Sequence, residues 1–358
     1  MNLLVRLIRR FKRNLQYLGI YTAVRDFRCV QVGGARGRLL IVCPGQLPIP
    51  PDGWGAVELL IHESIPSYIA EGYEVWILNS RARKDWKIAS KEEFKLILNH
   101  SDIDSLRVRR HWPNSTLVSV THYGLAAQPE KWDKGYHKVL QRLNFSNKII
   151  CLSPAILSTF LHYFDESKLL LSPNGSSFNF VNKKTKNGPI LYLGKVEKRK
   201  RQYEVWSLFK DSGIDILFAG PIVDERVIEQ MSLDASSAKN FTGEINRSSL
   251  QELFGRCSSL MLISEGEADA LVLYEAQIAG LPILVNMESL GSQDCQLPWV
   301  RLIKSSPSLQ EILTELESVN ISGDEISLYA NANYSWNVRN SKLIQLLNKF
   351  NEEEKSET

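Results

Sequence analysis

The stretch that decides the fold is RLLIVC at residues 38–43, followed by a loop rich in Gly and Pro, a helical pattern over 57–71, and YEVWILN at 73–79. The first run is apolar almost throughout, which is typical of a strand buried on both faces of a sheet. Two such strands joined through a helix form the βαβ unit of a parallel sheet. The sequence therefore predicts an α/β fold.

The same alternation continues along the chain and restarts after a polar linker at Asn182–Gly188. We predict two doubly wound Rossmann-like halves that face a cleft, with ligands beyond the carboxyl ends of the strands and between the halves. The further strands are expected at 117–120, 148–152, 168–172, 190–194, 214–219, 260–264, 283–286 and 300–303, a short extended stretch at 240–244, and helices at 202–210, 250–256, 271–279 and 308–319.

Composition narrows the class of protein. The 358 residues suggest about two domains of ~150 residues each. Hydrophobic residues at 44% and charged residues at 23% are ordinary for a globular protein and exclude a disordered, collagen-like or disulfide-scaffold chain. The net charge of +3 is too small to indicate nucleic acid as a partner. Five scattered cysteines without a CxxC pair indicate free thiols, no structural zinc site and a cytoplasmic location.

The N-terminal segment differs from the rest. Residues 1–28 hold seven Arg and Lys against Asp26, a net charge of 7 − 1 = +6, and no apolar run is long enough for a signal peptide or a membrane span. Two main interpretations of this amphipathic basic helix stay open: a helix packed on its own protein, or one lying on an anionic membrane surface. A mitochondrial transit peptide is a third and less favoured interpretation. We expect the segment to stand outside the first sheet, which favours the membrane. The apolar stripe is Leu4, Ile8, Phe11, Leu15 and Leu18.

The segment SEGEADALVLYEA at 264–276 contains the most informative set of candidate binding residues. Glu267 falls in a loop after a strand, and Glu275 in the second turn of the following helix. The helix N-terminus near Asp269, Ala270 and Leu271 offers unpaired amides to a diphosphate. Glu275 would accept hydrogen bonds from a ribose diol, and Glu267 from sugar hydroxyls. Taken alone, the two glutamates could equally be solvated side chains.

Two other strand ends carry polar groups toward the same face. GKVEKRKR at 194–201 brings Lys195 and Lys200, and cations at a helix start oppose the helix dipole unless an anion is bound nearby. His122 follows the strand LVSV directly, so it is expected to face the cleft. The other histidines are expected to be structural: His62, His100, His111, His137 and His162.

The loop GWGAVE at 53–58 joins the first strand to the first helix, where glycines such as Gly55 let backbone approach a phosphate. It is not the GxGxxG fingerprint, which disfavours a dinucleotide and a nicotinamide dehydrogenase. Asp102-Ile103-Asp104 has the spacing of a DxD motif, but its surroundings do not support a metal site.

Six segments together resemble the retaining glycosyltransferases of family 4. GWGAVE resembles the family's Gly-rich loop, THYG its T-x-H-G, and SPNGSSFNF its NG segment. LGKVEKRKRQ resembles its basic loop, EADALVLYEAQIAGLPIL its E-x7-E helix, and YSW its aromatic-Ser-Trp. They occur in the family's order over about 39–346, which makes the combined signal strong although each motif alone is moderate.

The resemblance implies the GT-B fold and transfer of a sugar from a nucleotide diphosphate sugar, with retention of configuration and without a metal. Together with the charge pattern and the linker, it gives four predicted parts: a basic segment at 1–37, an acceptor domain at 38–186, a nucleotide-sugar domain at 187–325 and a returning C-terminal helix at 326–358. The partners would be the donor and a glycan or lipid-linked acceptor, in surface polysaccharide or glycolipid synthesis at the cytoplasmic face of a membrane. The implied site residues are Lys195, Lys200, His122 and Glu267 for catalysis, and Gly55, Glu275, Asp269, Ala270, Leu271, Gly243 and Ile245 for the donor, with Gly243 and Ile245 assigned to the base by position only.

Three departures from the family pattern leave a second function open. The usual Gly-Phe-Gly after the first glutamate is Ala268-Asp269-Ala270, the usual Arg is Lys195, and the Asp of the NG segment is Ser177. Lys lacks the bidentate geometry of Arg. The alternative is therefore a degenerate GT-B protein that binds a nucleotide sugar or a partner without turnover.

Overall fold

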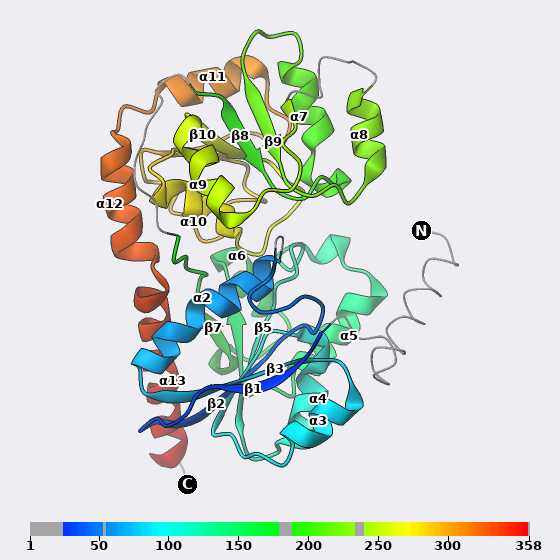
Figure 1. The fold of residues 1–358 in the computed structure, drawn as a ribbon, viewed down its shortest axis with the longest axis vertical. Helices are drawn as coiled ribbons and strands as arrows, with labels where there is room; N and C mark the ends of the chain where they lie inside the picture. The colour runs from blue at the N-terminus through cyan, green and yellow to red at the C-terminus, as the bar shows by residue number, and fades with distance from the viewer. Residues whose placement is uncertain (1–23, 53–54, 179–187, 233–239, 357–358) are drawn as a thin grey trace.

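The computed structural model describes residues 24–52, 55–178, 188–232 and 240–356, which form two α/β domains stacked one above the other (Figure 1). The first is built on a seven-stranded sheet in the order β1-β3-β2-β4-β5-β6-β7, parallel except for β1. Its strands are β1 (Arg25–Gln31), β2 (Gly37–Val42), β3 (Tyr73–Ser80), β4 (Leu96–Asn99), β5 (Thr116–Val120), β6 (Lys148–Cys151) and β7 (Leu169–Leu171). Its helices are α2 (Ala56–Ala70), α3 (Arg83–Ala89), α4 (Ser105–His111), α5 (Lys134–Leu143) and α6 (Pro154–Phe160), with short 3-10 turns η1 (Asp102–Asp104), η2 (Pro129–Lys131) and η3 (Glu166–Lys168).

The second domain has a five-stranded parallel sheet in the order β12-β11-β10-β8-β9. Its strands are β8 (Ile190–Leu193), β9 (Ile216–Ala219), β10 (Ser259–Leu262), β11 (Ile283–Val285) and β12 (Val300–Leu302). Its helices are α7 (Gln202–Phe209), α8 (Glu225–Ser232), α9 (Arg247–Arg256), α10 (Leu271–Ile278) and α11 (Leu309–Glu317), with the 3-10 turn η4 (Lys198–Lys200). The two sheets confirm the predicted pair of Rossmann-like halves.

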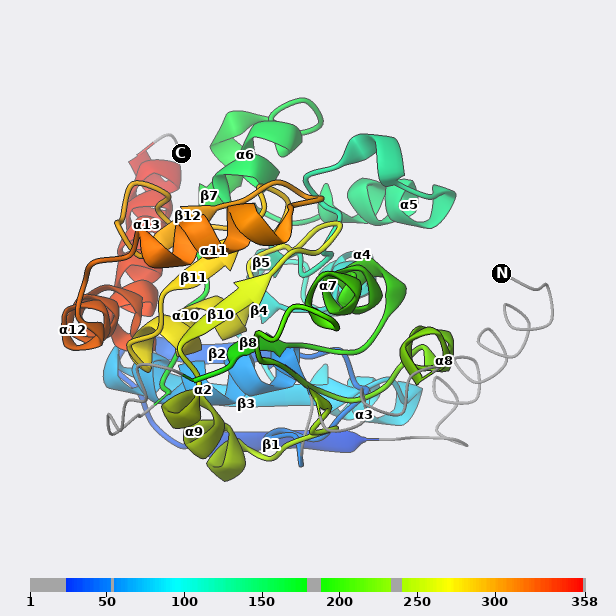
Figure 2. The same ribbon diagram turned by 90° about the horizontal axis from the view of Figure 1, so that it is seen from above.

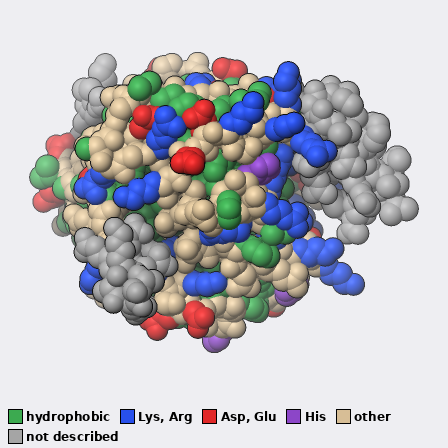
Figure 3. Space-filling model, turned by 90° about the horizontal axis from the view of Figure 1, so that it is seen from below, with side chains coloured by type: hydrophobic (Ala, Val, Ile, Leu, Met, Phe, Trp, Pro, Cys, Tyr) green, Lys and Arg blue, Asp and Glu red, His purple; other side chains and the backbone are tan. Residues whose placement is uncertain are grey.

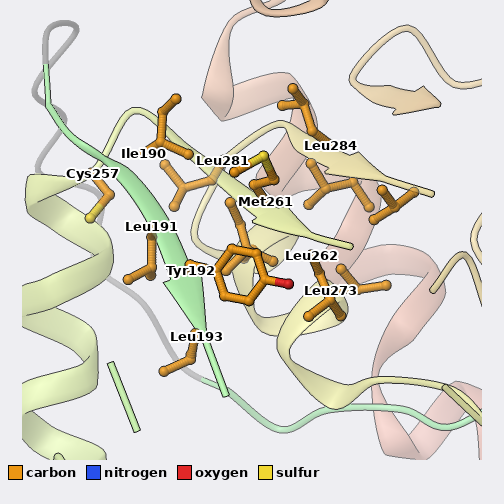
Figure 4. Close-up of a cluster of buried hydrophobic side chains, with 14 of the residues drawn as sticks. Ile190, Leu191, Tyr192, Leu193, Cys257, Met261, Leu262, Leu273, Leu281 and Leu284 are labelled. Atoms are coloured by element: carbon orange, nitrogen blue, oxygen red, sulfur yellow. The ribbon is translucent and has the colours of Figure 1, made fainter. Parts of the chain in front are cut away.

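Buried apolar side chains hold the second sheet to its helices. Leu191, Met261 and Leu284 come from three neighbouring strands, and they belong with Leu273 of α10 to one cluster of buried apolar side chains (Figure 4). All four are fully buried or nearly so, which is the condition for each to stabilise the fold by about 1.5–3 kcal/mol. Tyr192 lies in the same cluster, and its hydroxyl donates to the backbone oxygen of Lys200, so the core directly anchors the loop that follows β8.

Two C-terminal helices join the domains along one side of the molecule (Figures 1 and 2). α12 (Gly323–Tyr334) packs on α10, and α13 (Trp336–Ser356) returns to pack on α2 of the first domain. Asn340 of α13 donates to the Ser67 hydroxyl at 2.6 Å, and its side-chain oxygen accepts from Tyr68 at 3.3 Å. The predicted returning helix is thus present and is fixed by polar as well as apolar contacts.

The start of the chain differs from the prediction. Residues 25–31, which we expected outside the sheet, form β1 and pair antiparallel with β3. Two charges counted in the basic segment are engaged there: Arg25 bonds Asp85 at 2.6 Å, and Arg28 bonds Asp26 at 2.6 Å. The predicted amphipathic helix before residue 24 and all but the last residue of the linker 182–188 lie outside the described residues.

The face of the first domain that points away from the second carries Lys and Arg side chains spread among acidic and hydrophobic ones (Figure 3). Within the described ranges, no helix is long and apolar enough to cross a membrane.

Strand order decides where the polar loops meet. In each sheet the chain places its second parallel strand on one side of the first and its third on the other, so a crevice opens between the loops that leave the first and third strands. In the first domain these are the loops after β2 and β4. In the second they are the loops after β8 and β10, which carry the basic residues 194–201 and the glutamate loop 263–270.

Candidate functional site

The basic loop and the glutamate loop of the second domain are in direct contact. Lys200 Nζ lies 2.6 Å from Glu267 Oε1, and Arg199 Nη1 lies 3.2 Å from the same oxygen. The backbone amide of Glu265 also donates to the Arg199 oxygen at 2.8 Å. The two loops that the sequence analysis assigned to one site are therefore neighbours in the structure, and Lys200, which is 7% exposed, is not part of a solvated charge run.

Glu267 is held as a carboxylate. Burial by itself would raise its pKa, but the positive charges of Lys200 and Arg199 outweigh burial and lower the pKa below its usual value. The Ser264 hydroxyl adds a hydrogen bond to Oε1 at 2.6 Å. Because its partners come from two loops, the side chain has little freedom to leave this position.

A cavity of about 1350 Å³ lies beside these loops and is lined by both domains. Lys195, Lys200 and Glu267 line it from the second domain, and His122 and Gly55 from the first. Ala270, Leu271 and Val272 also line it, at the start of α10, where no side chain caps the helix. Uncapped amides at a helix start attract anions, so the wall combines two lysines with a positive helix end.

A smaller cavity of about 140 Å³ adjoins the first and shares Gly55 and Leu271 with it. Glu275 and Ile245, which were predicted to contact the nucleoside, both line it. Gly243 does not line either cavity. Its backbone oxygen instead accepts from the Gly220 amide at 2.9 Å, and its positive φ of 69° shapes the loop that carries Ile245.

Arg247 is a site residue that the sequence did not reveal. At the start of α9 it bonds the Glu275 carboxylate and also reaches Glu63 of α2 at 2.6 Å, so one guanidinium joins the two domains beside the smaller cavity. Burial raises the pKa of Glu275, and the Arg247 charge works against that rise. Glu275, the residue predicted to bind the ribose, is thus paired with the Arg247 cation in this structure.

The Asp269 carboxylate accepts hydrogen bonds from other groups of the protein. This buried carboxylate accepts from the Asn174 amide at 2.8 Å, the Tyr274 hydroxyl at 2.7 Å and the Ser292 amide at 3.1 Å. Burial raises its pKa to about 6. Asn174 follows the last strand of the first domain, so Asp269 ties the glutamate loop to that domain.

The first domain contributes a histidine pair. His100, which we expected to be structural, follows β4 at the cavity wall, and its Nδ1 lies 3.0 Å from His122 Nε2. β4 was not predicted, so the sequence had no strand end to mark His100 as a cavity residue. Asp102 stands beside the pair at the same wall. Its Oδ2 accepts from Thr121 at 3.1 Å, and its Oδ1 has no partner among the described residues.

The Gly-rich loop is described only from Gly55 onward. Gly55 is buried, and a Cβ there would come within 2.9 Å of Pro51 and 3.0 Å of Leu47, so close packing requires glycine. Glu58, three residues on, is a cavity residue that motif reasoning did not assign. Burial raises its pKa, and the charge of Lys195 across the cavity counteracts the rise. In the part of the chain that the structure describes, no three His, Cys, Asp or Glu side chains are grouped as a metal ion would need.

No protein-family model matches the chain, and no curated protein matches it in sequence. Solved structures do resemble it. Sucrose-phosphate synthase from Thermosynechococcus elongatus is similar with a TM-score of 0.68 and 13% identity over 87% of this chain and 98% of that one. Anabaena HepE in complex with UDP and glucose gives 0.68 and 13% over 87% and 99%. The lipopolysaccharide outer core galactosyltransferase WaaB gives 0.63 and 13% over 87% and 99%. These likenesses confirm the GT-B fold predicted from the sequence.

Proposed function

We propose that this protein is a retaining glycosyltransferase that moves a sugar from a nucleotide diphosphate sugar to an acceptor hydroxyl without a metal ion. The observation that carries the proposal is the convergence of Lys195, Lys200 and the uncapped start of α10 on one cavity that also holds Glu267 and His122. Such a cluster suits a diphosphate leaving group, whose charge grows as the bond to the sugar breaks.

The donor would span both cavities. The diphosphate would lie between the two lysines and the α10 amides, with the sugar toward Glu267 and His122. The nucleoside would occupy the smaller cavity, with its base near Ile245 and its ribose diol on Glu275. For that contact Arg247 has to share the Glu275 carboxylate or release it, since the two are paired in this structure.

The acceptor would enter from the first domain, which was predicted at residues 38–186 and to which the structure adds β1, with 187–325 as the donor domain and 326–358 as the returning helix. A glycan or lipid-linked acceptor at a cytoplasmic membrane face fits the basic amphipathic pattern of the N-terminal residues. Surface polysaccharide or glycolipid synthesis is the process we infer. WaaB, named for a lipopolysaccharide, has the same fold.

The second candidate is a GT-B protein that binds a sugar nucleotide without turnover. It is favoured by one observation: the loop that usually has glycines here carries Asp269, whose carboxylate ties the loop to Asn174. The tripeptide Ala268-Asp269-Ala270 contains no glycine and so leaves less backbone open to a donor sugar.

Two measurements separate these candidates. A thermal-shift screen of UDP, GDP and other nucleoside diphosphates identifies the base, starting with UDP because HepE was solved with it. Slow hydrolysis of the matching sugar nucleotide is then followed without an acceptor. Stabilisation together with hydrolysis supports the transferase, and stabilisation without hydrolysis supports the binding protein. No stabilisation by any nucleotide contradicts both.

A further inference from the structure

The two histidines at the cavity wall form one hydrogen-bonded unit. Their ring planes are 15° apart with centroids separated by 5.2 Å, and His100 Nδ1 lies 3.0 Å from His122 Nε2. Centroids so far apart with nitrogens so close mean that the rings meet edge to edge. Among the described residues, His100 is the hydrogen-bond partner of the His122 ring.

Both rings are neutral near pH 7. Burial lowers the pKa of His122 to about 4. Burial, with a smaller effect from His122, lowers that of His100 well below its usual value. A neutral imidazole has one N–H and one bare nitrogen. The two facing nitrogens therefore share a single hydrogen, and tautomer pairs in which both or neither of them carry hydrogen are excluded.

The shared hydrogen has a consequence for the free nitrogen of His122. If Nε2 donates to His100, Nδ1 is a bare acceptor; if Nε2 accepts, Nδ1 carries hydrogen and donates. The tautomer of His122 is thus coupled to that of its neighbour. His100 is itself well placed to act this way, because it is 8% exposed and its backbone amide donates to the Val42 oxygen at 2.8 Å.

We propose that His100 is a positioning residue for His122. It fixes the orientation of the His122 ring and couples the tautomer of His122 to its own. Nδ1 of His122 then acts toward a hydroxyl of the bound sugar either as a donor or as an acceptor, as that coupling sets. This inference rests on the proposed glycosyl transfer. His122 would touch the substrate, whereas His100 would act only through His122.

Three variants test the proposal. His100→Phe keeps a flat ring and removes the hydrogen bond. His100→Asn places an amide near the former Nδ1, which can donate or accept. His162→Asn is the matched control, since His162 is an exposed histidine of the same domain that does not line the cavity.

The kinetic arm measures donor hydrolysis or transfer. We expect His100→Phe to lower kcat by about 10- to 100-fold, the range for partners that orient a functional histidine, while the donor KM changes by less than about threefold. His100→Asn should recover most of the loss, and His162→Asn should match wild type. Unchanged kcat in a folded His100→Phe variant, or equal losses in the Phe and Asn variants, would overturn the proposal.

The spectroscopic arm does not need turnover. Ring nitrogen resonances of isotope-labelled histidine report the tautomer of each of the six histidines, with His122→Gln assigning the key pair. We expect wild-type His122 to show one protonated and one bare nitrogen, and His100→Phe to shift both toward averaged values. An unchanged tautomer for His122 in that variant refutes the coupling. If wild type hydrolyses no sugar nucleotide but the shift occurs, the glycosyl transfer is wrong and the coupling stands.

Discussion

Lys200 offers the sharpest test of the active-site assignment. Lys200→Met retains an unbranched side chain of similar length but removes the charge that lies 2.6 Å from Glu267 and lines the main cavity. If the lysine stabilises a leaving diphosphate, its loss removes an interaction that strengthens in the transition state. Removing one such group from a pre-organised site costs roughly 10²–10³-fold in kcat, or about 2.7–4 kcal/mol.

The same substitution perturbs Glu267, and the structure bounds that effect. Breaking a buried ion pair outright costs about 3–5 kcal/mol because the remaining charge is left without a partner. Here Arg199 and the Ser264 hydroxyl still bond the carboxylate, so we expect a loss of about 1–3 kcal/mol in unfolding free energy. Lys198→Met is the matched control: it removes a neighbouring cation of the same loop that is exposed and does not line the cavity.

The assay compares donor hydrolysis and nucleotide affinity in wild type, Lys200→Met and Lys198→Met. We expect turnover to fall by roughly 10²–10³-fold for Lys200→Met, with weaker binding of the nucleoside diphosphate, and to stay near wild type for the control. Lys195→Ala should behave like the Lys200 variant or lose somewhat less. A folded Lys200→Met protein that turns over within about threefold of wild type would refute the assignment of the basic loop.

Three other predictions address the ribose, the cavity carboxyl and the N-terminus. Glu275→Gln should weaken nucleotide binding by about 1.5–3 kcal/mol, because a ribose diol loses a charged acceptor, and calorimetry that finds equal affinity contradicts the ribose role. Burial raises the pKa of Asp102 to about 7, so the stability that its protonated form contributes is present below about pH 4 and is lost as the pH rises through 7. At pH 8, Asp102→Asn should therefore unfold at a higher denaturant concentration than wild type, with a free energy of unfolding larger by on the order of 1–3 kcal/mol. This difference should shrink as the pH is lowered toward 4. Full-length protein should sediment with anionic liposomes at low salt and less so at high salt, since each basic group near such a surface adds ~1 kcal/mol. A version that begins at residue 24, which leaves β1 intact, should stay in solution; equal sedimentation of both would end the membrane interpretation.

The sequence predicted every parallel strand of the two sheets except β4, and it also missed the antiparallel edge strand β1. The strands at 38–43 and 190–194 are continuous apolar runs, whose burial on both faces leaves a clear signal. β4 has the apolar run LILN and lies inside the sheet between β2 and β5, and it was missed although strands of the same length were predicted. β1 carries charged and polar residues on an antiparallel edge, and it depends on pairing with β3, which lies more than forty residues later in the chain. Such a partner cannot be read from local pattern.

The site was predictable to the extent that strand ends fix it. Lys200, Glu267 and His122 all follow strands, and parallel topology brings such positions to one edge. Their partners were not predictable in the same way. Arg247 contacts Glu63 across the domain boundary, and His100 contacts His122 between two strands, so both depend on side-chain positions that only the folded chain defines.

The charges around Glu267 bear on whether the protein turns over a substrate. Taking Lys200 and Glu267 out of water costs free energy, and apolar side chains of similar volume would often stabilise a fold as well or better. Stability alone is thus a weak reason to hold this pair at a cavity wall, whereas a site for a diphosphate and a sugar needs both charges. The Asp269 departure does not oppose this, because protein donors take both oxygens of its carboxylate and the amides at the start of α10 remain uncapped beside the cavity. Asp269 fixes the loop between the domains, and the groups that would meet the donor are still in place.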